Sequence, residues 1–235
     1  KNIIQNINGC FPPKSLCALM GPSGCGKTTF MNALCNKARY GKVTGTVRVN
    51  GKVDGLAGLD SLIGFVPQDD TVHPNLTVYD NLYYSAFARL PASMSKIEKM
   101  DEIETVIKVL GLDKVRNCLV GDAEKRGVSG GQRKRVNIGV ELVARPAVLF
   151  MDEPTSGLDG AATLSLLNCL SDLQTNQGLT IVCVIHQPRF SVFKKFSHVL
   201  LLGEGGKQVY VGRQDKVQPY LERLGFDMPQ GENSA

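Results

Sequence analysis

The sequence predicts an α/β fold with a parallel central sheet, interrupted by a helical insertion. The apolar runs at Ala147–Met151, Leu179–Ile185 and Val199–Leu202 are continuous rather than alternating, as in strands that helices cover on both faces. A glycine-rich turn joins an earlier strand, Leu16–Met20, to a helix-like run. Between these two parts, residues from about 69 to 144 follow a largely helical pattern.

Length and composition are those of one large globular domain. The 235 residues are 43% hydrophobic and 21% charged, which argues against disorder and against fibrous or collagen-like chains. No apolar run approaches the roughly 18 residues that a membrane helix needs, so we expect a soluble domain. The chain starts at Lys1, with neither a methionine nor a signal segment, and is therefore expected to be a piece of a longer protein.

Charge and cysteine content narrow the function only slightly. The net charge of +5 fits anionic small molecules, nucleic acid or acidic headgroups, and equally a solvated basic surface. The seven cysteines are odd in number and form no C-x-x-C pair, so neither a disulfide framework nor a zinc site is indicated. We expect mostly buried, reduced thiols at Cys10, Cys17, Cys25, Cys35, Cys118, Cys169 and Cys183.

The elements before the insertion follow in order. After the strand Leu16–Met20, a helix is predicted from Lys27 to about Asn36. Thr46–Val49 alternates and reaches Asn50-Gly51, which is a hairpin signal. Ile63–Val66 is another short strand.

Within the insertion, Ser95 and Glu98 have the spacing of a capping box that starts a helix. Apolar residues then recur at helical intervals: Ile97, Met100, Ile103, Val106, Ile107 and Leu110. Beyond the later parallel strands, Glu204–Gly206 is a turn that leads to a closing strand at Gln208–Val211.

A phosphate-binding loop is predicted after the first strand. The pattern G-x-x-x-x-G-K-[ST] is matched at every fixed position between a strand and a helix, a context that disfavours a chance glycine-rich turn. The glycines let backbone N–H groups surround phosphate oxygens at a helix start. Lys27 can reach the β- and γ-phosphates and Thr28 can ligate Mg²⁺. Cys25 is either a reactive thiol or a bystander. The predicted nucleotide-binding residues are Gly21, Pro22, Ser23, Gly24, Cys25, Gly26, Lys27, Thr28 and Thr29.

Two adjacent carboxylates follow the apolar run Val148–Met151. The carboxyl ends of strands are where α/β sheets place ligands. Asp152 suits the shell of a Mg²⁺ ion and Glu153 suits the attacking water, because only one of them is neutralised by metal. The alternative reading is a solvated acidic turn.

Two further polar residues follow strands. His186 comes after the run ending at Ile185; a lone histidine is more often structural, but this position favours hydrogen bonding to the γ-phosphate and orientation of water. Gln68 follows Phe65-Val66-Pro67, and its amide can reach metal or water, although its own pattern does not decide between a functional and a structural role.

A second glycine-containing helix start lies in the insertion. Val128, Ser129, Gly130, Gly131 and Gln132 open a helix-like run that continues to Ala144. Such a start is either a second anion cradle or a simple N-cap with a flexible entry.

Together these motifs resemble those of an ATP-binding cassette ATPase, and their order and spacing match across essentially the whole chain. The resemblance assigns them as the Walker A motif at Gly21–Thr28, the glutamine loop at Gln68, the signature at Val128–Gln132, the Walker B motif at Val148–Asp152 with Glu153, the D-loop at Ser156, Gly157, Leu158 and Asp159, and the switch histidine His186. It implies catalytic roles for Glu153, His186 and Gln68, and metal contacts from Thr28, Gln68 and Asp152.

Finer details resemble the eukaryotic G subfamily of transporters, the white-brown-complex or pleiotropic-drug-resistance type. They are Gln132–Arg135, Asp152–Asp159, His186–Arg189 and the segment from Leu76 to Leu82. In that subfamily the cassette precedes the membrane helices, so the transmembrane domain would lie outside this chain.

The resemblance implies a P-loop NTPase core of the RecA-like type over about residues 1–68 and 145–235, with a small antiparallel β subdomain. A helical subdomain would cover about 69–144. ATP and Mg²⁺ are the implied cofactors of a Mg-dependent ATPase. The adenine usually stacks on an aromatic residue before the Walker A strand; Phe11 is the only aromatic residue there and lies too near, so the stacking residue is expected outside the chain.

The implied partners are a second cassette, in a head-to-tail dimer that sandwiches two ATP molecules, and the protein's own membrane domain, docked on residues 69–90. The chain would work on the cytoplasmic side of a membrane. A soluble cassette ATPase acting on nucleic acid or ribosomes is the alternative, but no long coiled-coil insertion and no basic, aromatic stripe supports it, and no nucleic acid is expected. A non-catalytic regulator is disfavoured because all the motif residues are present together.

Overall fold

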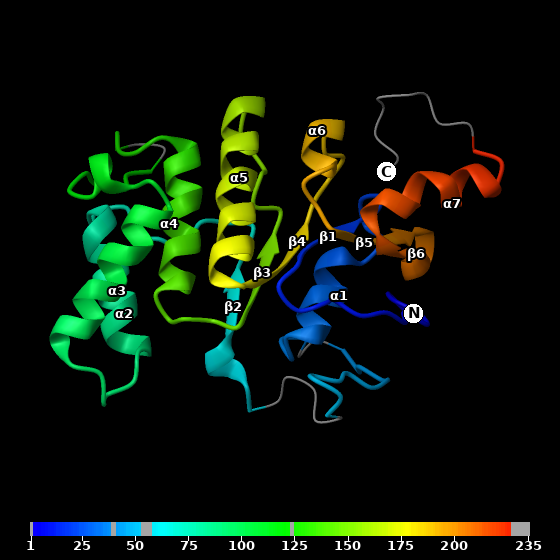
Figure 1. The fold of residues 1–235 in the computed structure, drawn as a ribbon, viewed down its shortest axis with the longest axis horizontal. Coiled ribbons are helices and arrows are strands. Elements are labelled where there is room, and N and C mark those ends of the chain that lie inside the picture. The colour runs from blue at the N-terminus through cyan, green and yellow to red at the C-terminus, as the bar shows by residue number, and fades with distance from the viewer. Residues whose placement is uncertain (1, 39–40, 53–57, 123–124, 227–235) are drawn as a thin grey trace.

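The computed structural model describes residues 2–38, 41–52, 58–122 and 125–226. One sheet forms its centre, with three helices grouped at one end (Figure 1). The strands are β1 Leu16–Met20, β2 Ile63–Val66, β3 Val148–Asp152, β4 Thr180–Val184, β5 His198–Gly203 and β6 Lys207–Arg213. The helices are α1 Lys27–Leu34, α2 Val78–Arg89, α3 Lys96–Val109, α4 Gly130–Leu142, α5 Gly160–Gln177, α6 Phe190–Phe193 and α7 Val217–Arg223.

The sheet confirms the predicted α/β class. Its strand order is β2-β3-β4-β1-β5-β6. The first five strands in this order pair in parallel, and β6 pairs antiparallel with β5. Every residue of β1 is buried, which explains why the sequence there is apolar without alternation.

The core lies on both faces of this sheet. Leu16, Ala18 and Met20 belong to the larger apolar cluster, which includes residues of α2–α5. Cys17 and Leu19 point to the opposite face and pack with residues of α1. Alternation of β1 side chains between two apolar layers is what burial by helices on both faces requires.

The helical group consists of α2, α3 and α4, and each helix begins with a capping box. The predicted box of Ser95 and Glu98 is confirmed at the start of α3. Thr77 with Asp80 caps α2 in the same way. Within the group, a Cβ on Gly139 of α4 would come 2.8 Å from Leu82 Cδ2 and 2.9 Å from Leu110 Cδ1. A side chain there would push the helices apart.

Several details of the elements differ from the predictions. The prediction of a strand at Thr46–Val49 is wrong, because in the described residues only a single bridge joins Val49 to Lys52. Residues 53–57, where a return strand would run, lie outside the described residues. The turn between Val49 and Lys52 does form, with φ of 51° at Asn50 and 82° at Gly51. The helix expected to reach about Asn36 ends at Leu34, with Cys35 as its C-cap. The whole of α5 was not predicted.

Burial shows which members of two predicted groups reach the core. Ile97 and Met100 are 72% and 38% exposed although they keep helical spacing with the core residues of α3. Five of the seven cysteines are buried, which confirms the prediction of mostly buried thiols, and Cys10 and Cys118 are exposed. Burial raises the pKa of the Cys17 thiol to about 11 and that of Cys35 to about 12, so both stay protonated at neutral pH.

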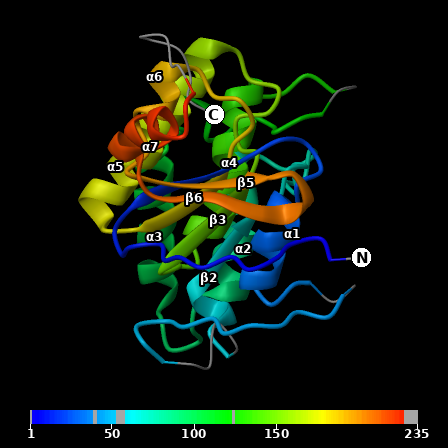
Figure 2. The ribbon, with the colours of Figure 1, turned by 90° about the vertical axis from the view of Figure 1, so that its right-hand side faces the viewer.

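The N-terminal segment runs beside the last strand (Figure 2). Gln5 forms a parallel bridge with Lys207 of β6, and its N–H donates to the Gly206 carbonyl at 2.9 Å. Among the described residues, no helix combines the length and the apolar character needed to cross a membrane.

Candidate functional site

The predicted polar residues meet along one edge of the sheet, because four parallel strands end there. The loop Gly21–Thr28 follows β1, Gln68 follows β2, the carboxylates follow β3, and His186 follows β4. Since the strand order is β2-β3-β4-β1, the edge presents the glutamine, the carboxylates, the histidine and the loop in that sequence. The carboxyl edge of a parallel sheet is where α/β proteins bind ligands.

The loop after β1 has a backbone that its glycines make possible. Gly21 has a φ of 149°, and a Cβ there would lie 2.2 Å from the Leu202 carbonyl oxygen. Gly24 and Gly26 have φ values of 75° and 98°, which disfavour other residues. Gly26 is the N-cap of α1 and supplies no side-chain hydrogen bond. The start of α1 therefore keeps its N–H groups for an external anion.

Lys27 lies across this loop. Only 7% of the residue is exposed, and its Nζ donates to the carbonyl oxygens of Gly21 and Pro22, at 2.9 Å each. Two neutral carbonyls stabilise an ammonium less than an anion does. The lysine is thus held at the loop with its charge still available to a phosphate.

Asp152 carries an unpaired oxygen at the end of β3. The residue is 4% exposed, and its Oδ1 has no hydrogen-bond partner among the residues that the structure describes. Burial raises the pKa of this carboxyl, and the neighbouring charge of Glu153 adds to the rise, whereas the Thr28 hydrogen bond and the charge of Lys27 oppose it. A buried carboxylate oxygen beside a hydroxyl is a donor set that suits Mg²⁺.

Glu153 and Gln68 contact each other. Gln68 Nε2 donates to Glu153 Oε2 at 3.2 Å. Glu153 has a φ of 46°, and its N–H donates to the Val184 carbonyl of β4 at 3.0 Å. A left-handed conformation at a non-glycine residue costs about 1–3 kcal/mol and persists only when the surroundings impose it. The bond to β4 helps to impose it here.

His186 lies next along the edge. It is exposed, and the strand before it is fixed by Ile185, whose N–H donates to the Leu19 carbonyl of β1 at 3.1 Å. Gln187, the next residue, has a φ of 41°. The chain thus passes through a left-handed residue just after each of these two strands, Glu153 after β3 and Gln187 after β4.

The start of α4 is built differently. Ser129 Oγ accepts from the Gln132 N–H at 3.3 Å, and the Ser129 N–H donates to Gln132 Oε1 at 2.9 Å. Added Cβ atoms would touch Leu158 from Gly130 and Ala162 from Gly131. The predicted signature therefore packs against the predicted D-loop, whose Asp159 caps α5 through the Ala162 N–H at 2.8 Å.

The structure does not bring this helix start to the phosphate-binding loop of its own chain. In Figure 1, α4 and α1 lie on opposite sides of β3 and β4. The residues at the sheet edge and the residues at the start of α4 therefore form two separate groups within one chain.

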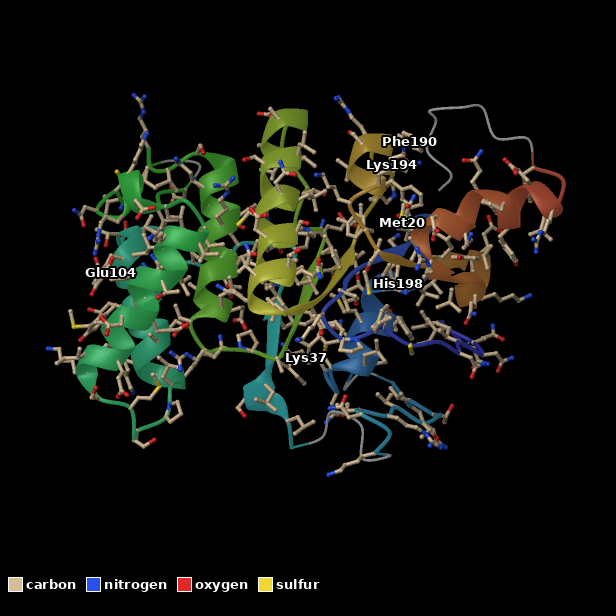
Figure 3. The ribbon with its side chains drawn as sticks, viewed as in Figure 1. Met20, Lys37, Glu104, Phe190, Lys194 and His198 are labelled. Carbon is tan, nitrogen blue, oxygen red and sulfur yellow. The ribbon has the colours of Figure 1, made fainter. Side chains whose placement is uncertain are left out.

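Two cavities in the described part of the chain, of about 320 and about 230 Å³, lie away from both groups. Lys37, which lines the second, is remote from Met20, the residue of β1 that leads into the loop (Figure 3). Pro22, Ser23 and Thr28 are instead exposed. The sheet edge is an open surface that another surface can cover.

Sequence reasoning missed the residues that support Gln68. Lys134 and Asn137, one turn apart on α4, bond to the segment Gln68–Thr71. The available signal was two polar residues, three apart, in a helix whose neighbouring residues Val136 and Ile138 are apolar and buried.

The chain resembles membrane transport proteins over its whole length. A family model described as "ABC transporter" matches residues 4–156, and one described as "ABC-2 type transporter" matches residues 186–235. "ABC transporter G family member 28" of Arabidopsis thaliana is 48% identical over 99% of the chain, which covers 21% of that protein.

Two other relatives agree. "ABC transporter G family member 25" of rice, Oryza sativa subsp. japonica, is 47% identical over 99% of the chain, which covers 23% of that protein. A "Probable ATP-dependent permease" of Saccharomyces cerevisiae is 38% identical over 100% of the chain, which covers 22% of it. The chain spans about a fifth of the length of these curated relatives.

Proposed function

Because this chain belongs to the ABC transporter family, we propose that it is the ATP-binding and ATP-hydrolysing motor domain of a transporter of the G family type. The observation that carries the proposal is the sheet edge, where an uncapped helix start and Lys27 face a buried carboxylate with a free oxygen. Such an edge is electrostatically incomplete. A triphosphate together with a divalent cation supplies the charges that it lacks.

The loop residues Gly21–Thr29 would bind the phosphates through backbone N–H groups and the Lys27 ammonium. Thr28 and Asp152 are the groups that would hold Mg²⁺, with Gln68 beside them. When bound, Mg²⁺ would neutralise charge that develops on the phosphate oxygens. The pKa of Asp152 is raised because burial without the cation disfavours the charged carboxylate.

Glu153 would orient and deprotonate the attacking water. It directly follows Asp152 at the end of β3, and its carboxylate accepts a hydrogen bond from the Gln68 amide. The Gln68 amide donates to Glu153, so it fixes the carboxylate whose direction determines where a water can sit. His186, exposed at the next strand end, would donate to the γ-phosphate.

A head-to-tail pair of cassettes would complete the site. The open sheet edge and the separate position of Val128–Gln132 in the same chain support this proposal. The start of α4, with its N–H groups and helix dipole, would then meet the γ-phosphate bound by the partner chain. Leu158 and Asp159 of the D-loop touch or adjoin this helix start and would lie at the same interface.

The names of the relatives support transport rather than action on nucleic acid or ribosomes, which stays the alternative. We propose that the membrane domain docks on residues 69–90, between Gln68 and the end of α2. Tyr84 in this segment is 60% exposed. Tyr84→Ala should leave ATP hydrolysis by this domain unchanged and lower ATP-driven transport by the full-length protein; normal transport would place docking elsewhere.

Hydrolysis of ATP by the purified chain tests the proposed function directly. We expect phosphate release with Mg²⁺, its loss with excess EDTA, and its return when Mg²⁺ is restored. Lys27→Ala should abolish it. Activity that persists in excess chelator, or in Lys27→Ala, would contradict this site.

A further inference from the structure

The segment that follows Gln68 is held by the helix that carries the signature. Lys134 of α4 donates from Nζ to the Gln68 carbonyl oxygen at 2.7 Å and lies 2.9 Å from Asp70 Oδ1. Only 9% of Lys134 is exposed. A lysine this buried is costly unless its charge is satisfied, so both contacts are structural requirements of this site.

A second residue of α4, one turn later, forms hydrogen bonds with the same segment. Asn137 is 1% exposed, and its Oδ1 accepts from both the N–H and the hydroxyl of Thr71, at 3.2 and 2.8 Å. Lys134 and Asn137 thus bind Gln68, Asp70 and Thr71 from one helix face. We call these five residues the loop clamp.

The loop clamp connects the two halves of the proposed composite site. At one end, Gln68 Nε2 donates to Glu153 Oε2 at 3.2 Å. At the other end, α4 begins with Ser129, five residues before Lys134 and therefore about one and a half helical turns away. A shift of the helix that carries the signature must pull on the backbone of Gln68, because Lys134 bonds to its carbonyl oxygen.

We propose that Lys134 is a positioning residue that sets the place of Gln68, and through it the carboxylate of Glu153, according to the position of α4. This inference rests on the proposed ATPase function and adds a residue to it that does not touch the nucleotide. A partner cassette that engages the start of α4 would act on Glu153 through this path.

The chain contains a matched control. Lys99 of α3 is 7% exposed, and its Nζ donates to the Leu90 carbonyl oxygen at 3.2 Å. It is a second buried lysine bonded to a backbone carbonyl in the same helical group, but its partner is not part of the site. Lys134→Met and Lys99→Met remove comparable charges and differ in what those charges hold.

The test measures ATP hydrolysis, the KM for ATP and the melting temperature of both variants. Lys134→Met should lower kcat about tenfold with KM nearly unchanged, the size of a typical coupling effect, and Lys134→Arg should recover most of it. Lys99→Met should keep the wild-type kcat. Equal losses in both methionine variants, or none in Lys134→Met, would overturn the inference. Asp70→Asn, which keeps Lys134, should show a smaller loss in the same direction and serves if Lys134→Met does not fold.

A double variant separates positioning from general destabilisation. If Lys134 acts through Gln68, then Lys134→Met should lower kcat no further in a Gln68→Ala background, because contacting residues on one path are non-additive. Fully additive losses would overturn the inference.

Hydrogen exchange supplies a readout that needs no nucleotide. The backbone amides of residues 68–71 should exchange about tenfold faster in Lys134→Met than in wild type or Lys99→Met; unchanged exchange would also overturn the inference. A wild-type chain that does not hydrolyse ATP would contradict the proposed function, while this exchange comparison would still decide whether Lys134 holds the segment.

Discussion

The two glycine-containing helix starts of this chain are built in opposite ways, although both are proposed to bind phosphate. The start of α1 has Gly26 as its N-cap and no side-chain cap. The start of α4 has a complete capping box of Ser129 and Gln132. At the start of α1, the acceptors for the free backbone N–H groups are left to a ligand. At the start of α4, the side chains of Ser129 and Gln132 supply some of these acceptors.

The proposed function explains this difference by the stage at which each helix start would bind its anion. The loop before α1 lies beside Lys27 and the carboxylates of its own chain, so a nucleotide can satisfy it in the monomer. In the proposed head-to-tail pair, the start of α4 meets an anion only when a partner arrives, and a helix end without a cap costs stability until then. A helix start that waits for a partner therefore needs its own cap, and one that binds its ligand alone does not.

The largest expected effect concerns the chemical step at the α1 side. Glu153→Gln removes the proposed base and should lower turnover by about 10²–10⁴-fold while ATP still binds. Because bound ATP is no longer cleaved, a dimer should accumulate with ATP and be visible by size-exclusion chromatography. Near-normal turnover in Glu153→Gln would remove this residue from the role.

Mixing two defective chains tests whether the two helix starts share one nucleotide. Lys27→Ala and Ser129→Arg each damage both sites of a homodimer, but their heterodimer has one site with two intact halves. Phosphate release by the mixture, at high protein concentration, should exceed that of either variant, by up to one active site per heterodimer. Two further controls are cross-linking, to show that heterodimers form, and a heterodimer of wild type with a doubly mutated chain, to show that one site suffices. No recovery under those conditions would show that the two helix starts do not share one nucleotide.

The unsatisfied character of the α1 side predicts a stability effect at Asp152. Its pKa is raised by burial, so the folded state binds this proton more tightly than the unfolded chain, and folding is favoured below the unfolded pKa. That contribution is lost as pH rises through the folded pKa. Asp152→Asn should therefore raise the free energy of unfolding at pH 7 by roughly 1–3 kcal/mol. The decrease of this free energy from acidic to neutral pH should also be smaller in Asp152→Asn than in the wild type. Urea unfolding without nucleotide measures both effects. A lower stability in Asp152→Asn would show that the carboxylate is satisfied.

The smallest expected effect concerns the cap of α4. Ser129→Ala should lower the free energy of unfolding by about 1 kcal/mol, whereas Ser129→Asp keeps an acceptor for the Gln132 N–H and should lower it less. Urea unfolding of both variants makes the measurement. If Ser129→Ala matched the wild type, the start of α4 would be as independent of its cap as that of α1.

The sequence predicted the site better where its parts are local. The loop, Asp152, Glu153, Gln68 and His186 each follow an apolar strand, and parallel pairing brings such ends to one edge. The sequence could not predict that Lys134 reaches the Gln68 carbonyl, because 66 residues separate them and nothing local marks the pair. Their contact depends on how α4 packs beside β2.

The fold shows the same division. Strands buried on both faces were recognised from continuous apolar runs, but Ile97 and Met100 show that helical spacing alone does not decide which apolar residues reach the core. The unpredicted α5 carried local signals, with Asp159 as its N-cap and Gly178 in a left-handed conformation at its end. Its position against the sheet depends on packing, which periodicity does not report.

The left-handed residues Glu153 and Gln187 also bear on engineering of this domain. Glycine or asparagine adopts such a φ with little strain, so either residue at these positions should make the domain more tolerant of heat. At Glu153 the same change would remove the proposed base. Screens of random variants for survival of heating and screens for phosphate release should therefore select opposite residues at Glu153, and thermostability obtained there would come at the expense of turnover.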